Sequence, residues 1–190
     1  GMESALDYHL SCLAEATADG DEESFSLSPE DCAELFTEGV IYYYRYLHFF
    51  ELQDWRRALR DTARNLRLFD FVREHAEREE DRVHLEQWRP YIVRMNAIAA
   101  VMIELEQERF DRALKILDAA GRRIERLPEV DDPTFRYERR RSVTALREMS
   151  RQIEKSMPLG EADRLERELN AAVMAEEFER AAELRDRIKT

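Results

Sequence analysis

Apolar side chains recur at intervals of three and four residues along most of the chain, which predicts a series of amphipathic helices. Ser28, Asp54 and Asp132 each precede such a pattern as expected N-caps, and the first and last of them are followed by a proline. Pro90 either begins or kinks a helix, because a later proline removes a backbone hydrogen bond. The expected helices span residues 3–18, 29–50, 55–72, 83–107, 110–127 and 133–156.

The helix predicted over residues 29–50 is rich in aromatic side chains. Its apolar positions alternate in steps of four and three, as expected of a stripe that faces the core: Phe36, Val40, Tyr43, Leu47 and Phe50. The next helix carries Leu68 and Phe71 outside its main stripe, so we expect it to be covered on two sides. An alternative hypothesis is a ligand pocket between the aromatic helices, lined by Tyr42, Tyr44, Trp55 and Trp88.

A weak internal repeat relates two of the predicted helix junctions. The segment from Leu47 to Leu59 aligns with the segment from Met102 to Leu114 at an offset of 55 residues. In both, an aromatic residue opens a helix, and an alanine three positions later lets the preceding helix approach closely. Phe178 and Ala181 follow the same rule. The paired helices resemble those of tetratricopeptide repeats, although the offset exceeds the usual period of ~34 residues.

Composition favours a fold made almost entirely of helices. The 190 residues include only five glycines and five prolines, and 38% of them are charged. We therefore expect an all-α protein, with a body of antiparallel, tetratricopeptide-like helical hairpins and a further helical hairpin at the C-terminus. The expected divisions are an acidic N-terminal helix and connector at 1–27, the helical-repeat-like body at 28–157 and the hairpin at 158–190, where Pro158 and Gly160 interrupt any continuous helix.

Two short apolar stripes adjoin each other near the C-terminus. The first comprises Leu165, Leu169, Ala172 and Val173, and the second comprises Phe178, Ala181, Leu184 and Ile188. No glycine or proline lies between them, so the pattern predicts two antiparallel helices joined by a short turn at residues 174–177. Helices below about 12–15 residues are marginal alone in water, so we expect this hairpin to pack against a partner surface.

The same stretch resembles the UVR motif, the small domain that ends UvrB and recurs inside UvrC. The resemblance rests on residues 177–188, which read EFERAAELRDRI, and on the leucines and alanine of residues 165–172. It implies a helical hairpin that docks on a like hairpin, as UvrB does on UvrC, with no chemistry of its own. The protein-binding residues that it implies are Leu165, Leu169, Ala172, Phe178, Ala181, Ala182, Leu184, Arg185 and Ile188. McsA-type regulators linked to the Clp protease also carry the motif, together with CxxC zinc sites that this sequence lacks.

The net charge of −12 is concentrated in the N-terminal part of the chain. Eleven acidic residues precede Arg45, the first Lys or Arg, and the remainder is close to neutral. The acidic segment either pairs with a basic protein surface or forms a solvated helix face. Binding to a nucleic-acid backbone needs a concentrated basic surface, and the strongest basic cluster, Arg139 to Arg141, adjoins an acidic loop. We therefore do not expect nucleic acid as a partner.

No constellation of residues in the sequence predicts catalysis. A Gly-rich phosphate loop, HExxH and Gly-x-Ser-x-Gly are all missing. His9 and Cys12 stand three apart on a predicted helix, but tetrahedral zinc needs two further ligands. We expect no enzymatic activity, no cofactor and no metal site. No apolar run is long enough to span a membrane, so we expect a cytoplasmic protein.

The leading hypothesis from the sequence is a non-enzymatic adaptor that recruits a protein partner through the C-terminal hairpin. The partner would be another UVR-type hairpin or a second copy of the chain. In a structural alternative, the hairpin completes a core or a homodimer. A third hypothesis is a DNA-repair accessory protein that contacts nucleic acid through Arg139 to Arg141.

Overall fold

The computed structural model describes residues 4–21, 24–157 and 161–188. For residues 161–164, 166 and 167 it describes the backbone only. Their secondary structure is helical apart from one isolated bridge between Leu27 and Ala76, so the all-α prediction is confirmed. The chain divides into two compact units, Gly1–Ile153 and Glu154–Thr190. The elements are α1 (Ala5–Ala18), α2 (Pro29–Glu51), α3 (Trp55–His75), α4 (Glu79–His84), the 3-10 turn η2 (Glu86–Trp88), α5 (Arg89–Leu105), α6 (Phe110–Glu125), α7 (Pro133–Ser156), α8 (Glu161–Met174) and α9 (Phe178–Ile188).

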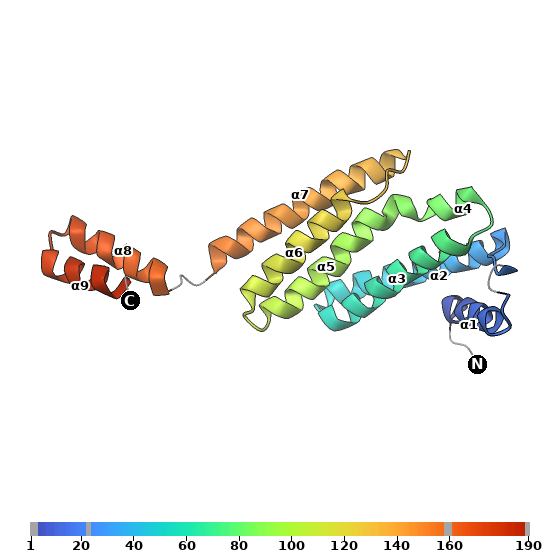
Figure 1. Cartoon of the computed structure of the whole chain (residues 1–190), viewed down its shortest axis with the longest axis horizontal. Helices are drawn as coiled ribbons and strands as arrows, with labels where there is room; N and C mark the ends of the chain where they lie inside the picture. The colour runs from blue at the N-terminus through green and yellow to red at the C-terminus, as the bar shows by residue number, and fades with distance from the viewer. Residues whose placement is uncertain (1–3, 22–23, 158–160, 189–190) are drawn as a thin grey trace. The chain divides into compact units, whose positions relative to one another are not determined.

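The first unit is a row of antiparallel helices. α3 packs between α2 and α5, and α5 packs between α3 and α6 (Figure 1). Because α3 is covered on two sides, Leu68 and Phe71 are buried together with its main apolar stripe, as the sequence predicts. Antiparallel packing is therefore confirmed, whereas a tetratricopeptide-like repeat remains a prediction.

Capping side chains begin the helices where the sequence predicts them. Ser28 forms a capping box with Asp31, in which the Ser28 hydroxyl accepts from the Asp31 backbone N–H at 3.2 Å. Asp54 and Asp132 accept backbone N–H hydrogen bonds from the first turns of α3 and α7. Pro90 lies in the first turn of α5, where its missing N–H costs no helical hydrogen bond.

The predicted core stripe of α2 is wrong in register. The buried residues of this helix are Cys32, Leu35, Gly39 and Tyr46. Val40, which the pattern places in the core, is exposed. An aromatic-rich helix has apolar residues on several faces, so periodicity alone does not say which face meets the core. Three residues of the predicted stripe, Phe36, Val40 and Tyr43, instead line a cavity.

Charged groups are buried where the central helices meet. The Arg89 guanidinium donates to both carboxylate oxygens of Glu86, at 2.6 and 2.5 Å, and to Asp70 at 2.8 Å. Asp61 of α3 is fully buried and accepts two hydrogen bonds from Arg45 of α2, at 2.5 and 2.8 Å. Removing one partner from such a pair leaves an uncompensated buried charge, so these pairs fix the register of the helices.

Candidate functional site: the terminal helical hairpin

Helices α8 and α9 form a hairpin that buries its own apolar seam. Leu165 and Ala172 of α8 pack against Ala181 and Leu184 of α9, with Leu169 and Ile188 partly buried at the edges of the cluster. The seam follows the 3.6-residue period of both helices, as the sequence predicts. The two helices therefore cover each other, and the apolar surface that still faces solvent lies elsewhere on the hairpin.

The turn between α8 and α9 is a Schellman motif without glycine. Glu176 adopts a left-handed conformation with φ of 59°. Its N–H donates to the Val173 carbonyl at 3.1 Å, and the Glu177 N–H donates to the Ala172 carbonyl at 2.8 Å. Both bonds satisfy carbonyls at the end of α8, so three residues are enough to reverse the chain.

Two turns of the first unit use the same geometry. Gln53 and Glu108 are also left-handed, with φ of 56° and 54°. In each turn the next residue donates its N–H to a carbonyl five positions earlier, at 2.8 Å for Asp54 and 2.9 Å for Arg109. The alanine that follows the opening aromatic residue is buried in all three hairpins, at Ala58, Ala113 and Ala181. The local similarity detected in the sequence thus corresponds to a shared turn.

The three turns differ in what covers their apolar residues. In the first unit the opening aromatics are half-buried, and Trp55 packs edge-on against Phe50 with ring centroids 5.6 Å apart. In the terminal hairpin the matching pair is exposed, with 68% of Phe178 and 49% of Val173 accessible to solvent. Met174 is 86% exposed, and it occupies the position that Glu51 and Glu106 hold in the other two turns. We call Val173, Met174 and Phe178 the hairpin tip.

The residues predicted to bind protein fall into two groups. One group forms the seam and is buried or partly buried: Leu165, Leu169, Ala172, Ala181, Leu184 and Ile188. The other group is exposed on α9: Phe178, Ala182 and Arg185. These three are spaced by four and then three residues, so they share one face of the helix. The sequence analysis did not include Met174 among the binding residues. Aligning the three turns in the sequence places Met174 at the position that Glu51 and Glu106 occupy in the other two.

The charges around the hairpin are local and solvent-exposed. Arg185 donates from Nε and Nη2 to the neighbouring Asp186 carboxylate at 3.0 and 2.9 Å. Arg180 pairs with Glu177 at 3.2 Å across the first turn of α9. Exposed pairs of this kind contribute little to stability, typically under about 1 kcal/mol. They leave the guanidinium of Arg185 accessible for an acidic group on a partner.

The structure gives little support to the other sites considered in the sequence analysis, namely the basic cluster, a metal site and a membrane span. Arg139 pairs with Glu129 at 2.6 Å and also donates to the Glu125 carbonyl, and Arg141 pairs with Glu138 at 3.3 Å, so acidic neighbours neutralise much of the basic cluster. Within the parts of the chain that the structure describes, no cluster of three or more metal-ligating side chains occurs. Among the same residues, no helix combines the length and the apolar character that crossing a bilayer requires.

The geometry defines a small helical hairpin with a closed seam and an exposed apolar tip, a form suited to binding protein. Residues 160–190 match the UvrB/uvrC motif (UVR), a helical hairpin that mediates protein interaction. The resemblance inferred from the sequence is therefore confirmed for this segment. No curated protein and no solved structure matches the chain. The match bears on the hairpin and not on the helices of the first unit.

Proposed function

We propose that the chain is a non-enzymatic, cytoplasmic adaptor whose terminal hairpin docks on a helical hairpin of a partner protein. Contact is made by the hairpin tip and by Ala182 and Arg185, which continue from Phe178 along the same face of α9. The seam residues act indirectly, because they hold α8 and α9 together. The tetratricopeptide-like helices of the first unit would then carry the hairpin to its partner.

The observation that carries this proposal is the exposure of the tip. Methionine and phenylalanine are enriched in protein interfaces, and methionine adapts its shape to different partners. The matching aromatics of the first unit are half-buried, with Trp55 packed on Phe50 and glutamates at the position of Met174. The terminal turn keeps the same backbone but presents three apolar side chains to solvent. A second hairpin packed across the tip would bury these three side chains.

Photo-crosslinking tests the proposal in the full chain. A benzophenone amino acid placed at Phe178 should crosslink to a partner hairpin in cells, and mass spectrometry would identify the attached peptide. Glu183 is a matched control, because it is also exposed on α9 but lies about 140° around the helix from Phe178. Equal crosslinking from both positions would contradict a defined docking face. A crosslink that joins two copies of this chain would favour the homodimer over the adaptor.

A further inference from the structure

The first unit contains a cavity that the hairpin does not use. It has a volume of about 450 Å³ and lies among α2, α3, η2, α5 and α7. The volume is in the range of about 300–1,000 Å³ that is typical of small-molecule sites. Most of the wall is aromatic or aliphatic, and two polar atoms of wall residues, Tyr46 Oη and Asn65 Oδ1, are inaccessible to solvent. A ligand therefore meets mainly apolar surface.

The aromatic residues suspected from the sequence are only partly those that line the cavity. Tyr44 and Trp88 do line it. Tyr42 instead lies between two guanidinium groups, which are 3.9 and 3.8 Å from its ring centroid. Trp55 packs on the last turn of α2. The cavity is thus bounded by a different set of side chains from the one suspected.

Apolar side chains also lie where the cavity meets solvent. Val40 and Tyr44 of α2 and Trp88 of η2 line the cavity and are nevertheless exposed. Contiguous exposed apolar surface on a soluble protein commonly marks a binding groove. The apolar body of a ligand would cover these three side chains and fill the space behind them.

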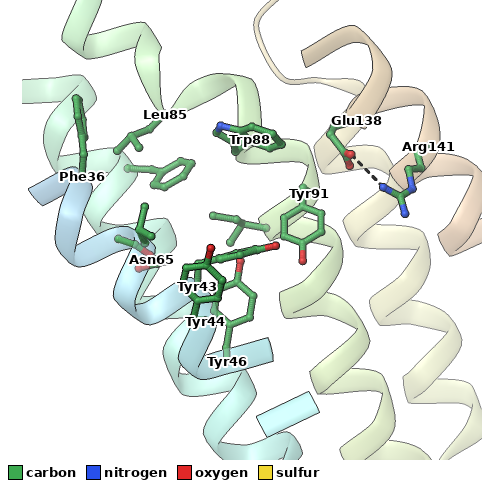
Figure 2. A pocket seen from close by; sticks show the side chains of 14 residues that line it. Phe36, Tyr43, Tyr44, Tyr46, Asn65, Leu85, Trp88, Tyr91, Glu138 and Arg141 are labelled. Carbon is green, nitrogen blue, oxygen red and sulfur yellow. Dashed lines mark hydrogen bonds and ion pairs between the residues drawn. The ribbon is translucent and has the colours of Figure 1, made fainter. Parts of the chain in front are cut away.

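The charged groups of the wall lie at the α7 end of the cavity. Figure 2 shows Glu138 and Arg141 there, across the cavity from the tyrosines of α2. The buried Glu138 carboxylate lies between two guanidinium groups, at 3.3 Å from Arg141 Nη1 and 3.6 Å from Arg94 Nη2. One carboxylate thus faces two cations. Burial lowers the pKa of Arg94 despite this partner, as expected where positive charge is only partly compensated.

The accessible charge at this end is positive. The Arg141 side chain is 55% exposed, and its Nη1 donates to Glu138, which leaves four of the five guanidinium N–H groups for another acceptor. Arg140 is exposed, and no ion pair joins it to another described residue. Both arginines line a shallow hollow on α7 that shares Arg141 with the cavity. Glu148 also lines the hollow, but it lies two turns, about 10 Å, beyond Arg141.

We propose that the cavity binds a single-chain amphiphilic anion, which has an apolar body and a terminal carboxylate. The body fills the aromatic part of the cavity. The carboxylate lies at the α7 end, where the exposed guanidinium groups of Arg140 and Arg141 donate charge-assisted hydrogen bonds to it. A cationic group would be repelled there. This site is independent of the hairpin, and its failure would leave the proposed adaptor function untouched.

Equilibrium dialysis of the full chain against decanoate, at concentrations too low for micelles, tests the proposal. Saturable binding of one molecule per chain is expected. Decanol has the same chain without the charge, so it should bind about tenfold more weakly. Octanoate is two methylenes shorter and should bind roughly fifteenfold more weakly, because each buried methylene contributes about a factor of four. Absence of saturable decanoate binding, or equal affinity for decanoate and decanol, would overturn the proposal.

Anionic phospholipids combine the same apolar and anionic chemistry in a membrane surface. Co-sedimentation of the full chain with phosphatidylglycerol vesicles distinguishes that surface from a free amphiphile. The net charge of −12 opposes approach to an anionic membrane, so the protein should remain in the supernatant. Co-sedimentation with the vesicles would overturn the assignment to a free amphiphile.

Matched variants of α7 locate the carboxylate. Arg141→Gln should lower the affinity for decanoate about tenfold, and Arg140→Gln should lower it severalfold. Neither should change the affinity for decanol, and retained decanol binding shows that the cavity is intact. Arg147→Gln is the control, because Arg147 is also exposed on α7 but lines neither the cavity nor the hollow. An undiminished preference for decanoate over decanol in both Arg141→Gln and Arg140→Gln would refute the site.

A second pair of variants locates the apolar body. Val40 and Ile41 are adjacent exposed residues of α2, but only Val40 lines the cavity. Val40→Trp should obstruct the entrance and reduce the affinity for decanoate and for decanol at least tenfold, whereas Ile41→Trp should leave both unchanged. Both substitutions are at exposed positions, so both proteins should fold. Equal effects of the two substitutions would show that the ligands bind elsewhere.

Discussion

Substitution of Leu184 and of Phe178 should affect the hairpin very differently, although both are apolar residues of α9. Leu184 is 4% exposed in the seam, and Phe178 is 68% exposed at the tip. Leu184→Ala removes three buried carbons at ~0.8 kcal/mol each, and the cavity left behind raises the expected loss to about 3 kcal/mol. Truncating a fully buried phenylalanine to alanine costs about 3–5 kcal/mol of stability. Only about a third of the Phe178 side chain is buried, so Phe178→Ala should destabilise the hairpin by about 1 kcal/mol.

Native-state hydrogen exchange of the full chain measures this difference directly. The difference of about 2 kcal/mol between the variants corresponds to a roughly thirtyfold difference in amide exchange rates within α8 and α9. A hairpin of two short helices has little stability in reserve, so Leu184→Ala should exchange nearly as an unfolded segment. If Phe178→Ala accelerated exchange as much as Leu184→Ala, the division between a structural seam and a free tip would be refuted.

Three further predictions concern other parts of the chain. Glu176→Gly should raise the free energy of unfolding of the hairpin by about 1 kcal/mol, because glycine tolerates φ of 59°, and slower amide exchange in α8 and α9 would show it. Arg89→Ala should destabilise the first unit by about 3–5 kcal/mol in thermal unfolding, whereas replacing Arg89 and Glu86 together with apolar residues should cost less. Burial, reinforced by nearby Asp81 and Asp31, raises the pKa of Cys32 to about 11 from 9.0, so a thiol reagent at pH 8 should modify Cys12 and spare Cys32 until the protein unfolds. Because the unfolded thiol ionises first, the contribution of Cys32 to stability is complete below pH 9 and is lost as the pH rises through 11.

Local signals in the sequence predicted most of the helices and their caps. The helix expected over residues 83–107 is wrong at its start, because α4 ends at His84, η2 follows, and α5 begins only at Arg89. Ser28, Asp54 and Asp132 act on backbone groups within three residues, so their role depends little on the rest of the fold. The seam of the terminal hairpin was also predictable, because two helices joined by a short turn have only one way to bring their apolar stripes together. Pro158 and Gly160, the expected interruption before the hairpin, lie outside the described residues.

The side chains that face solvent or a cavity were harder to predict. Phe178 belongs to the apolar pattern of α9, and periodicity does not distinguish a seam residue from one at the end of the helix. Val40 likewise fits a core stripe of α2 but lies at the edge of a cavity. Such distinctions depend on which neighbouring helices are present, and α7, which contributes Glu138 to the cavity, is nearly a hundred residues away in sequence.

The most direct test of the docking account is the affinity of the full chain for the partner identified by crosslinking at Phe178. Phe178→Asp should abolish binding, because the charge cannot be buried at an apolar interface, and hydrogen exchange in the seam should change little. Glu183→Ala should bind as the original chain does. Full affinity of Phe178→Asp for that partner would contradict the claim that the exposed tip is the docking surface.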